Sequence, residues 1–133
     1  MRRDLNVNSA IAHPAHDSTL TIQPSSAETH DQHTVQGYAY AGGGRRVTRV
    51  EVSADGGRSW TLADIEYPED KYRERAFEGD VWGTIDLTER EESFCWVFWK
   101  VQVDLAKISN ASCLCVRAGD EGLCSQPDTM YWK

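Results

Sequence analysis

Four cysteines are the side chains with the most varied chemistry in this sequence. They are Cys95, Cys113, Cys115 and Cys124, and no two of them form a Cys-x-x-Cys pair. Cys113 and Cys115 alternate with apolar residues, a spacing typical of a β-strand. A zinc site and a set of disulfides are both alternatives, but the missing ligand spacing favours buried free thiols in a reducing compartment.

The histidines form two pairs with i,i+3 spacing, His13 with His16 and His30 with His33. Imidazoles are common metal ligands, so the four side chains are candidates for a metal site. However, His13 precedes a proline, and His30 and His33 lie among polar residues without helix signals. We therefore interpret all four as solvated loop residues.

No arrangement of residues in the sequence indicates a catalytic centre. No strained turn of the nucleophile-elbow type marks a serine. The acidic pair Glu91–Glu92 lies in a charged stretch, which is more typical of a solvated loop than of acid–base catalysis. The glycines at 42–44 lack the Lys-Ser/Thr that follows them in a phosphate-binding loop, so they indicate a turn. We predict no catalytic, cofactor-binding or metal-ligating residue in this chain.

The composition indicates one globular domain and excludes several classes of partner. The chain has 133 residues, of which 40% are hydrophobic, and a net charge of −7. This acidity argues against a nucleic-acid binder and against binding to an anionic membrane surface. The longest apolar run, Phe94 to Trp99, is far too short to span a membrane. No apolar stretch follows the first four residues as in a secretory signal, so we expect a cytoplasmic protein.

Apolar residues recur along the chain with strand-like rather than helical spacing, and clusters of Gly, Asp and Ser separate the runs. Residues 1–12 are interpreted as a lead-in. The charged stretch 66–92 is interpreted as a long loop with a short strand near 81–87. The other segments expected to form strands are 18–22, 34–41, 46–53, 60–65, 93–105 and 111–118. This pattern predicts an all-β antiparallel sandwich.

Strand alternation also predicts which side chains form the core. One face of the 93–105 segment is apolar throughout and is expected to be buried. It holds Cys95, Val97, Trp99, Val101, Val103 and Leu105. Two neighbouring segments are expected to add Val50, Val52, Leu114 and Val116, while Val47 shares the outward face with Arg49 and Glu51.

The opposite face of the 93–105 segment begins with Phe94, Trp96 and Phe98. A solvated outer face should not begin with three aromatic residues. Tyr38 and Tyr40 lie on the non-core face of another strand. Either the 66–92 loop of the same chain or a partner molecule covers these rings, and the sequence gives both alternatives equal weight.

Several segments resemble a known family. They are residues 35–53 (VQGYAYAGGGRRVTRVEVS) and 55–60 (DGGRSW). The chain resembles the dimerisation domain of molybdenum-cofactor oxidoreductases, the C-terminal immunoglobulin-like module of sulfite oxidase and of eukaryotic nitrate reductase. Fungal-type assimilatory nitrate reductase is indicated by the segments 67–73 (YPEDKYR), 94–100 (FCWVFWK) and 116–123 (VRAGDEGL). The departures are Gly119, where the family has a large residue, and Cys124, where it has Asn.

The resemblance implies an all-β, immunoglobulin-like antiparallel β-sandwich over residues 13–133, with an acidic insertion at 66–92 and a truncated C-terminus. Residues 1–12 would lead in from an upstream molybdenum domain that is absent here. The implied partners are a second copy, forming a homodimer, and that upstream domain. The implied cofactor is molybdenum-molybdopterin in the parent enzyme, with haem and FAD if it is a nitrate reductase. None of the four cysteines inherits the role of molybdenum ligand.

The sequence is compatible with three functions. The first is a dimerisation module of an assimilatory nitrate reductase, which reduces nitrate to nitrite, with a sulfite oxidase-type module as the close alternative. The second is a stand-alone immunoglobulin-like binding domain, and the third is a small metal-binding enzyme that uses histidines and cysteines. For the first function, the predicted dimer interface consists of Tyr38, Tyr40, Phe94, Trp96 and Phe98.

Overall fold

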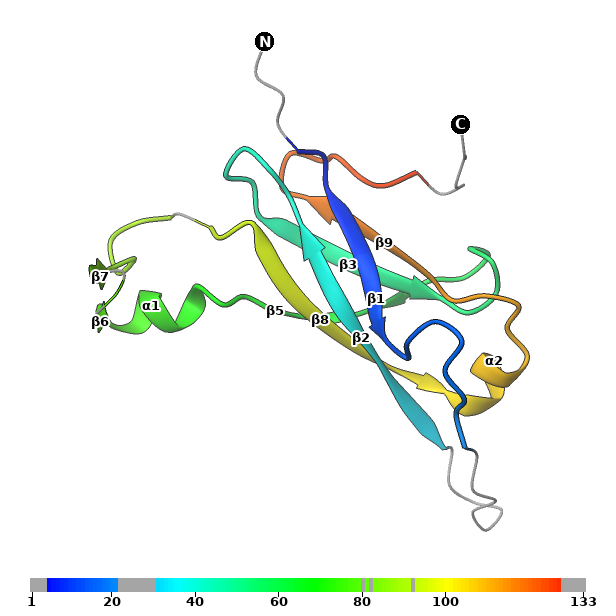
Figure 1. Ribbon diagram of the computed structural model, residues 1–133. Helices are drawn as coiled ribbons and strands as arrows, with labels where there is room; N and C mark the ends of the chain where they lie inside the picture. The colour runs from blue at the N-terminus through cyan, green and yellow to red at the C-terminus, as the bar shows by residue number, and fades with distance from the viewer. Residues whose placement is uncertain (1–4, 22–30, 80, 82, 92, 128–133) are drawn as a thin grey trace.

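Two antiparallel β-sheets pack face to face in the computed structural model, which describes residues 5–21, 31–79, 81, 83–91 and 93–127 (Figure 1). The first sheet has the order β1-β2-β8-β5, and the second has the order β4-β3-β9. The strands of the first sheet are β1 (Asn8–His13), β2 (Gln32–Tyr40), β8 (Trp96–Asp104) and β5 (Asp64–Glu66). Those of the second are β4 (Thr61–Leu62), β3 (Val47–Ser53) and β9 (Cys115–Asp120), and the short helix α2 (Leu105–Ser109) follows β8. The predicted immunoglobulin-like sandwich is thereby confirmed.

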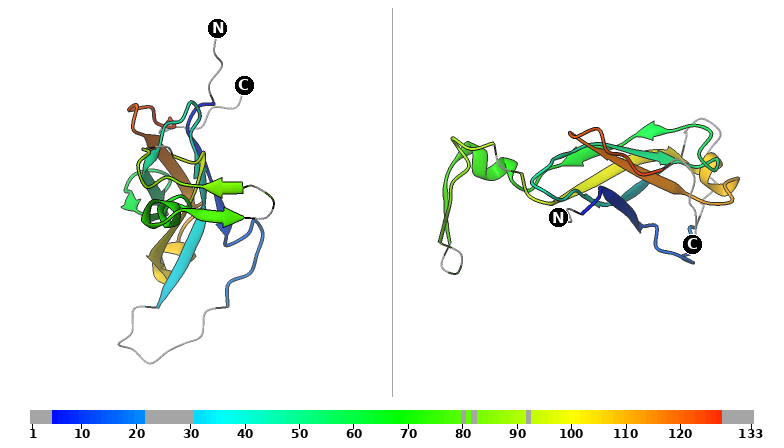
Figure 2. Two further views of the ribbon diagram at one scale, coloured as in Figure 1. Left: turned by 90° about the vertical axis from the view of Figure 1, so that its left-hand side faces the viewer. Right: turned by 90° about the horizontal axis from the view of Figure 1, so that it is seen from above.

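A separate unit projects from one end of the sandwich (Figure 2). It consists of α1 (Asp70–Glu74) and the hairpin of β6 (Phe77–Gly79) and β7 (Gly83–Ile85), and we call these three elements the arm. The charged stretch 66–92 is therefore not the long loop predicted from its composition. The strand expected near 81–87 is present but shorter, and it pairs with β6 rather than with either large sheet.

Alternation along β2, β3 and β8 builds the core between the sheets. Val97, Trp99, Val101 and Val103 of β8 are buried, as are Val50 and Val52 of β3, which confirms their predicted positions. Leu114 and Val116 are partly buried and pack against this core. The other buried members include Val35, Ala39, Ala41, Val47 and Ala118.

Three residues depart from the predicted alternation, each for a local reason. Val47 is buried rather than outward because the register between β3 and β9 shifts between Val47 and Arg49, which turns Val47 inward. Cys95 is exposed because β8 begins only at Trp96, and Leu105 is half-buried because it begins α2. The strand expected at 18–22 is absent over residues 18–21, and Ile22 lies outside the described part of the chain.

Two glycines turn the chain after β3. Gly56 and Gly57 both have positive φ angles, which glycine adopts without a Cβ clash. The buried Ser53 hydroxyl accepts a hydrogen bond from the Gly57 amide at 2.9 Å, and the Asp55 carboxylate accepts hydrogen bonds from the Arg58 and Ser59 amides. The chain then passes through β4 and crosses to the other sheet as β5. This crossing places β5 beside β8 at the edge of the first sheet.

The loop after β9 is tied to the sandwich by a buried carboxylate. Asp120 accepts hydrogen bonds from Arg45 Nε at 2.8 Å and from the Cys124 amide at 3.0 Å. Burial raises the pKa of Asp120, but these hydrogen bonds outweigh it and hold the pKa below its usual value. The Gln126 side chain then joins β9 to β1, since it accepts from the Ala118 amide and donates to Asn8 Oδ1.

Strand β1 is closely docked on β2. Residues 8–12, interpreted from the sequence as part of a lead-in, lie in this strand, and residues 8–11 pair with residues 37–40 of β2. Gly37 permits the approach, because a Cβ there would collide with the Ala10 carbonyl oxygen and lie 2.6 Å from Cζ2 of Trp99. Glycine at this position is therefore required by packing rather than by a turn.

We expect Gly37→Ala to lower the free energy of unfolding by about 1–3 kcal/mol, the usual cost of overpacking. The matched control is Gly119→Ala in β9, where the nearest atom to an added Cβ is the Cys124 carbonyl oxygen at 3.6 Å. This control should be neutral or raise stability by about 0.5 kcal/mol, because it restricts the unfolded chain. Urea unfolding of both variants measures the difference, and equal stabilities would contradict the packing role of Gly37.

Candidate dimer interface

Four aromatic residues share the outer face of β2 and β8. They point outward because their neighbours Ala39, Val97 and Trp99 point into the core. The strand register pairs Tyr38 with Phe98 and Tyr40 with Trp96. We call the four residues Tyr38, Tyr40, Trp96 and Phe98 the aromatic face.

The Trp96 ring lies in contact with two other rings of the aromatic face. The ring centroid of Trp96 lies 5.3 Å from that of Tyr38 and 4.8 Å from that of Tyr40. Trp96 nevertheless keeps 50% of its surface exposed, and Phe98 keeps 52%. Clustered aromatic residues with this exposure are typical of a surface that another molecule covers.

The arm reaches only the rim of this surface. Phe94 lies just before β8, and its ring centroid is 5.8 Å from that of Tyr72 in α1. Tyr72 in turn contacts Phe77 of β6 at 5.9 Å. Of the five aromatic residues predicted for the interface, four are therefore brought together and Phe94 lies between them and the arm. The arm of the same chain therefore contacts Phe94, whereas about half of the surface of Trp96 and of Phe98 stays exposed.

The base of the arm is fixed by contacts that the sequence pattern did not indicate. The Arg46 guanidinium stacks on the Tyr67 ring at 3.6 Å and pairs with Asp70 at 3.1 Å. The Tyr67 hydroxyl donates a hydrogen bond to the Val47 carbonyl at 2.8 Å. Burial raises the pKa of Tyr67, so the phenol keeps its proton for this bond. These contacts hold α1 beside the sheet edge.

A hollow of about 710 Å³ adjoins the aromatic face. Its lining includes Tyr38 and Phe98 of the aromatic face, the acidic residues Asp64, Glu66 and Asp70, and the basic residue Lys100. Sequence reasoning missed this acidic rim because β5 reaches the first sheet only after crossing over from β4. The surface that faces solvent is therefore an apolar centre with a charged edge, the arrangement found in protein interfaces.

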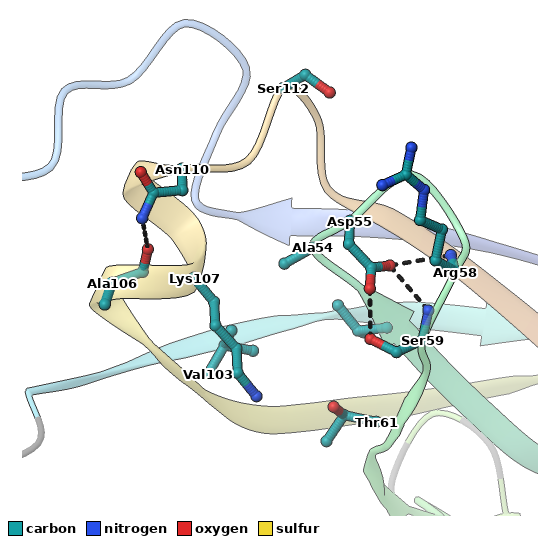
Figure 3. Close-up of a pocket in the computed structure, with 11 residues that line it drawn as sticks. Ala54, Asp55, Arg58, Ser59, Thr61, Val103, Ala106, Lys107, Asn110 and Ser112 are labelled. Atoms are coloured by element: carbon teal, nitrogen blue, oxygen red, sulfur yellow. Dashed lines mark hydrogen bonds between the residues drawn. The ribbon is translucent and has the colours of Figure 1, made fainter.

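A second hollow, of about 620 Å³, lies at the other end of the sandwich between α2 and the turn after β3 (Figure 3). Its polar lining consists of Asp55, Arg58, Ser59, Thr61, Lys107, Asn110 and Ser112. The Asp55 carboxylate is already engaged by Ser59, and these hydrogen bonds hold its pKa far below the usual value. The residues that line this hollow include no histidine and no cysteine, so they do not form a nucleophile–base pair that uses either residue type.

The positions of the cysteines correct one prediction. Cys95, Cys113 and Cys124 are exposed and Cys115 is half-buried, so the expected burial is wrong, although all four are free. Cys95 lies outside β8 and Cys113 outside β9, so only Cys115 is held by a strand.

Two histidines also depart from their predicted place. His13 ends β1 and His33 lies in β2, with ring centroids 5.2 Å apart, so these two are strand rather than loop residues. His16 is exposed, and His30 lies outside the described residues.

The described residues bring together no three His, Cys, Asp or Glu side chains that could hold a metal ion. The two closest thiols, those of Cys113 and Cys115, belong to exposed or half-buried residues rather than to a lined cavity for a large cofactor. These residues therefore do not fit a molybdopterin site. In the described part of the chain, no helix is long and apolar enough to cross a membrane.

The fold is an immunoglobulin-like β-sandwich that exposes aromatic rings on the outer face of its first sheet. A family model described as the Mo-co oxidoreductase dimerisation domain matches residues 1–133. The chain belongs to this family.

Similar proteins agree with this assignment. The chain is 51% identical over 130 residues to a nitrate reductase [NADPH] of Emericella nidulans and 48% identical to one of Aspergillus niger, covering 97% of this chain in each case. It spans only 14% of the length of these relatives. The sulfane dehydrogenase SoxCD of Paracoccus pantotrophus shares the fold with a TM-score of 0.55 and 22% identity, over 92% of this chain and 23% of that one.

The two neighbouring tryptophans of β8 should differ sharply in their contribution to stability. Trp99 is 2% exposed, so we expect Trp99→Ala to cost about 3–5 kcal/mol of unfolding free energy. Trp96 is 50% exposed and packs against the rings of Tyr38 and Tyr40, so Trp96→Ala should cost about 1 kcal/mol in the monomer. Chemical denaturation at low protein concentration measures both, and a larger loss for Trp96→Ala would place that side chain inside the fold.

Proposed function

We propose that this chain is the dimerisation domain of an assimilatory nitrate reductase and that two copies associate through the aromatic face. The half-exposed cluster of Trp96, Phe98 and Tyr38 is the observation that carries this proposal. Burial of aromatic surface contributes strongly to association, and these rings lose little side-chain freedom on binding. Tyr40, which pairs with Trp96, and Phe94, which lies just before β8, extend the contact at the end where β8 begins.

A two-fold contact explains how one surface can serve both molecules. In a symmetric homodimer the same patch is used twice, so each aromatic face meets its own copy. The strands of the sandwich hold the rings rigidly, which lowers the entropic cost of association. The acidic residues Asp64 and Glu66 stay at the rim, where water can solvate them.

The parent enzyme would carry its chemistry elsewhere. The relatives named above are nitrate reductases that use NADPH, which supports reduction of nitrate to nitrite as the parent reaction. The molybdenum cofactor would lie in an upstream domain of the polypeptide, with haem and FAD in further domains. A cytoplasmic location is supported by the four free cysteines, which persist in a reducing compartment.

Sedimentation velocity of the wild-type chain tests the contact. We expect a homodimer at tens of micromolar, a concentration at which even interfaces of about 10 µM affinity are populated. Trp96→Asp should give a folded monomer, because it places two charges in the contact and none in the core. The matched control is Leu62→Asp, which changes an exposed apolar residue of β4 in the other sheet and should leave the dimer intact.

The contradicting outcomes are distinct. A monomeric wild-type chain would overturn association through this domain, and a dimer that survives Trp96→Asp but not Leu62→Asp would place the contact on the other sheet.

The parent reaction is tested separately by replacing the matching segment of the Emericella nidulans enzyme with this chain. The chimera should be dimeric and reduce nitrate with NADPH, and a dimeric but inactive chimera would count against the nitrate reductase assignment alone.

A further inference from the structure

The thiols of Cys113 and Cys115 lie unusually close together. Their Sγ atoms are 3.7 Å apart, and both cysteines are free. The other two cysteines lie elsewhere, Cys95 just before β8 and Cys124 in the loop after β9. Only the Cys113–Cys115 pair combines a short sulfur–sulfur distance with exposure to solvent, as Cys113 is exposed and Cys115 is half-buried.

The local backbone explains why the two sulfur atoms lie near each other and why they can approach to bonding distance. Cys115 is the first residue of β9 and is paired with Ser53 of β3, whereas Cys113 lies two residues earlier in an irregular segment. Alternation places residues i and i+2 on the same side, with Cα atoms about 6.6 Å apart in an extended chain. A disulfide accepts Cα separations of about 4.4–6.8 Å, so bond formation needs only a modest shift of the unpaired segment that carries Cys113.

We propose that Cys113 and Cys115 form a reversible dithiol–disulfide site that hydrogen peroxide or a similar small peroxide oxidises. The Cys113 sulfur attacks one peroxide oxygen, the O–O bond breaks, and a sulfenic acid and one water molecule form. The Cys115 sulfur then attacks the Cys113 sulfur, the S–O bond breaks, and the S–S bond forms. The hydroxyl group leaves as a second water molecule. Two thiols lose two electrons to the peroxide, and their protons end in the two waters.

The environments of the two sulfurs assign the order of these steps. Cys113 is exposed, so peroxide reaches it first. Burial and the neighbouring Cys113 thiol raise the pKa of Cys115, which leaves it protonated and less reactive toward the oxidant. Cys115 is therefore the resolving thiol, held by β9 at the distance where it meets an oxidised Cys113.

The site is independent of the proposed dimer contact. Cys115 belongs to β9 of the second sheet, whereas the aromatic face lies on the outer side of the first sheet. Oxidation is therefore expected to leave the oligomeric state unchanged, and the two proposals can fail separately.

The test uses a Cys95→Ser/Cys124→Ser variant of the chain, which retains only the pair. After one equivalent of hydrogen peroxide, the titre of free thiols should fall from two to zero per chain and return with dithiothreitol. Trypsin cleaves after Lys107 and Arg117, so both cysteines lie in the single peptide 108–117. We expect its mass to fall by two hydrogens and the peptide to resist alkylation until it is reduced.

A Cys113→Ser change in the same variant is the matched control. It should abolish the loss of two hydrogens in peptide 108–117, while intrinsic fluorescence confirms that the chain is folded. Peptide mapping of the wild-type chain gives the same readout without any substitution. The proposal is overturned if the peptide accepts two alkyl groups after peroxide treatment, or if oxidation yields sulfinic acid or disulfides between chains instead.

Discussion

The pairing of β2 with β8 determines most of the side chains that this domain buries in its core and most of the apolar side chains that it exposes to solvent. Val97 and Trp99 must face the second sheet to close the core, so Trp96 and Phe98 must face away from it. The partner strand adds Tyr38 and Tyr40 directly opposite them. A shift of one residue would bury these aromatic rings but expose the core residues. Both faces of β8 begin with apolar side chains, but only one face packs against the second sheet. A single chain therefore leaves some of these side chains exposed.

Other parts of the chain leave that outer face open. Gly37 lets β1 dock at the far edge of β2 without covering the rings, and β5 pairs with β8 on the opposite edge. The arm turns away from the sandwich after β5, anchored by Arg46, Tyr67 and Asp70, and returns to touch the rim at Phe94. The aromatic face is therefore framed on three sides by the chain's own elements.

The sequence predicts the sandwich and most of the core because alternation between Val35 and Ala41, and between Trp96 and Val103, follows a strict period of two. It fails at Val47, because a change of register depends on the partner strand rather than on the strand's own residues. The composition did not reveal the arm, because its helix and hairpin are too short to show a clear periodicity. The acidic rim and the Arg46–Tyr67 contact escaped prediction because they join segments whose proximity only the crossover of β5 creates.

The central claim is that Trp96 becomes buried between two copies of the chain while Trp99 is buried in each copy alone. Fluorine NMR of the chain with 5-fluorotryptophan tests this directly, with the Trp96 resonance assigned through Trp96→Phe and the Trp99 resonance through Trp99→Phe. On dilution through the dissociation range, the Trp96 resonance should move and gain sensitivity to exchange of H2O for D2O, while the Trp99 resonance stays in place. A Trp96 resonance that stays unchanged while sedimentation shows the dimer dissociating would contradict the account.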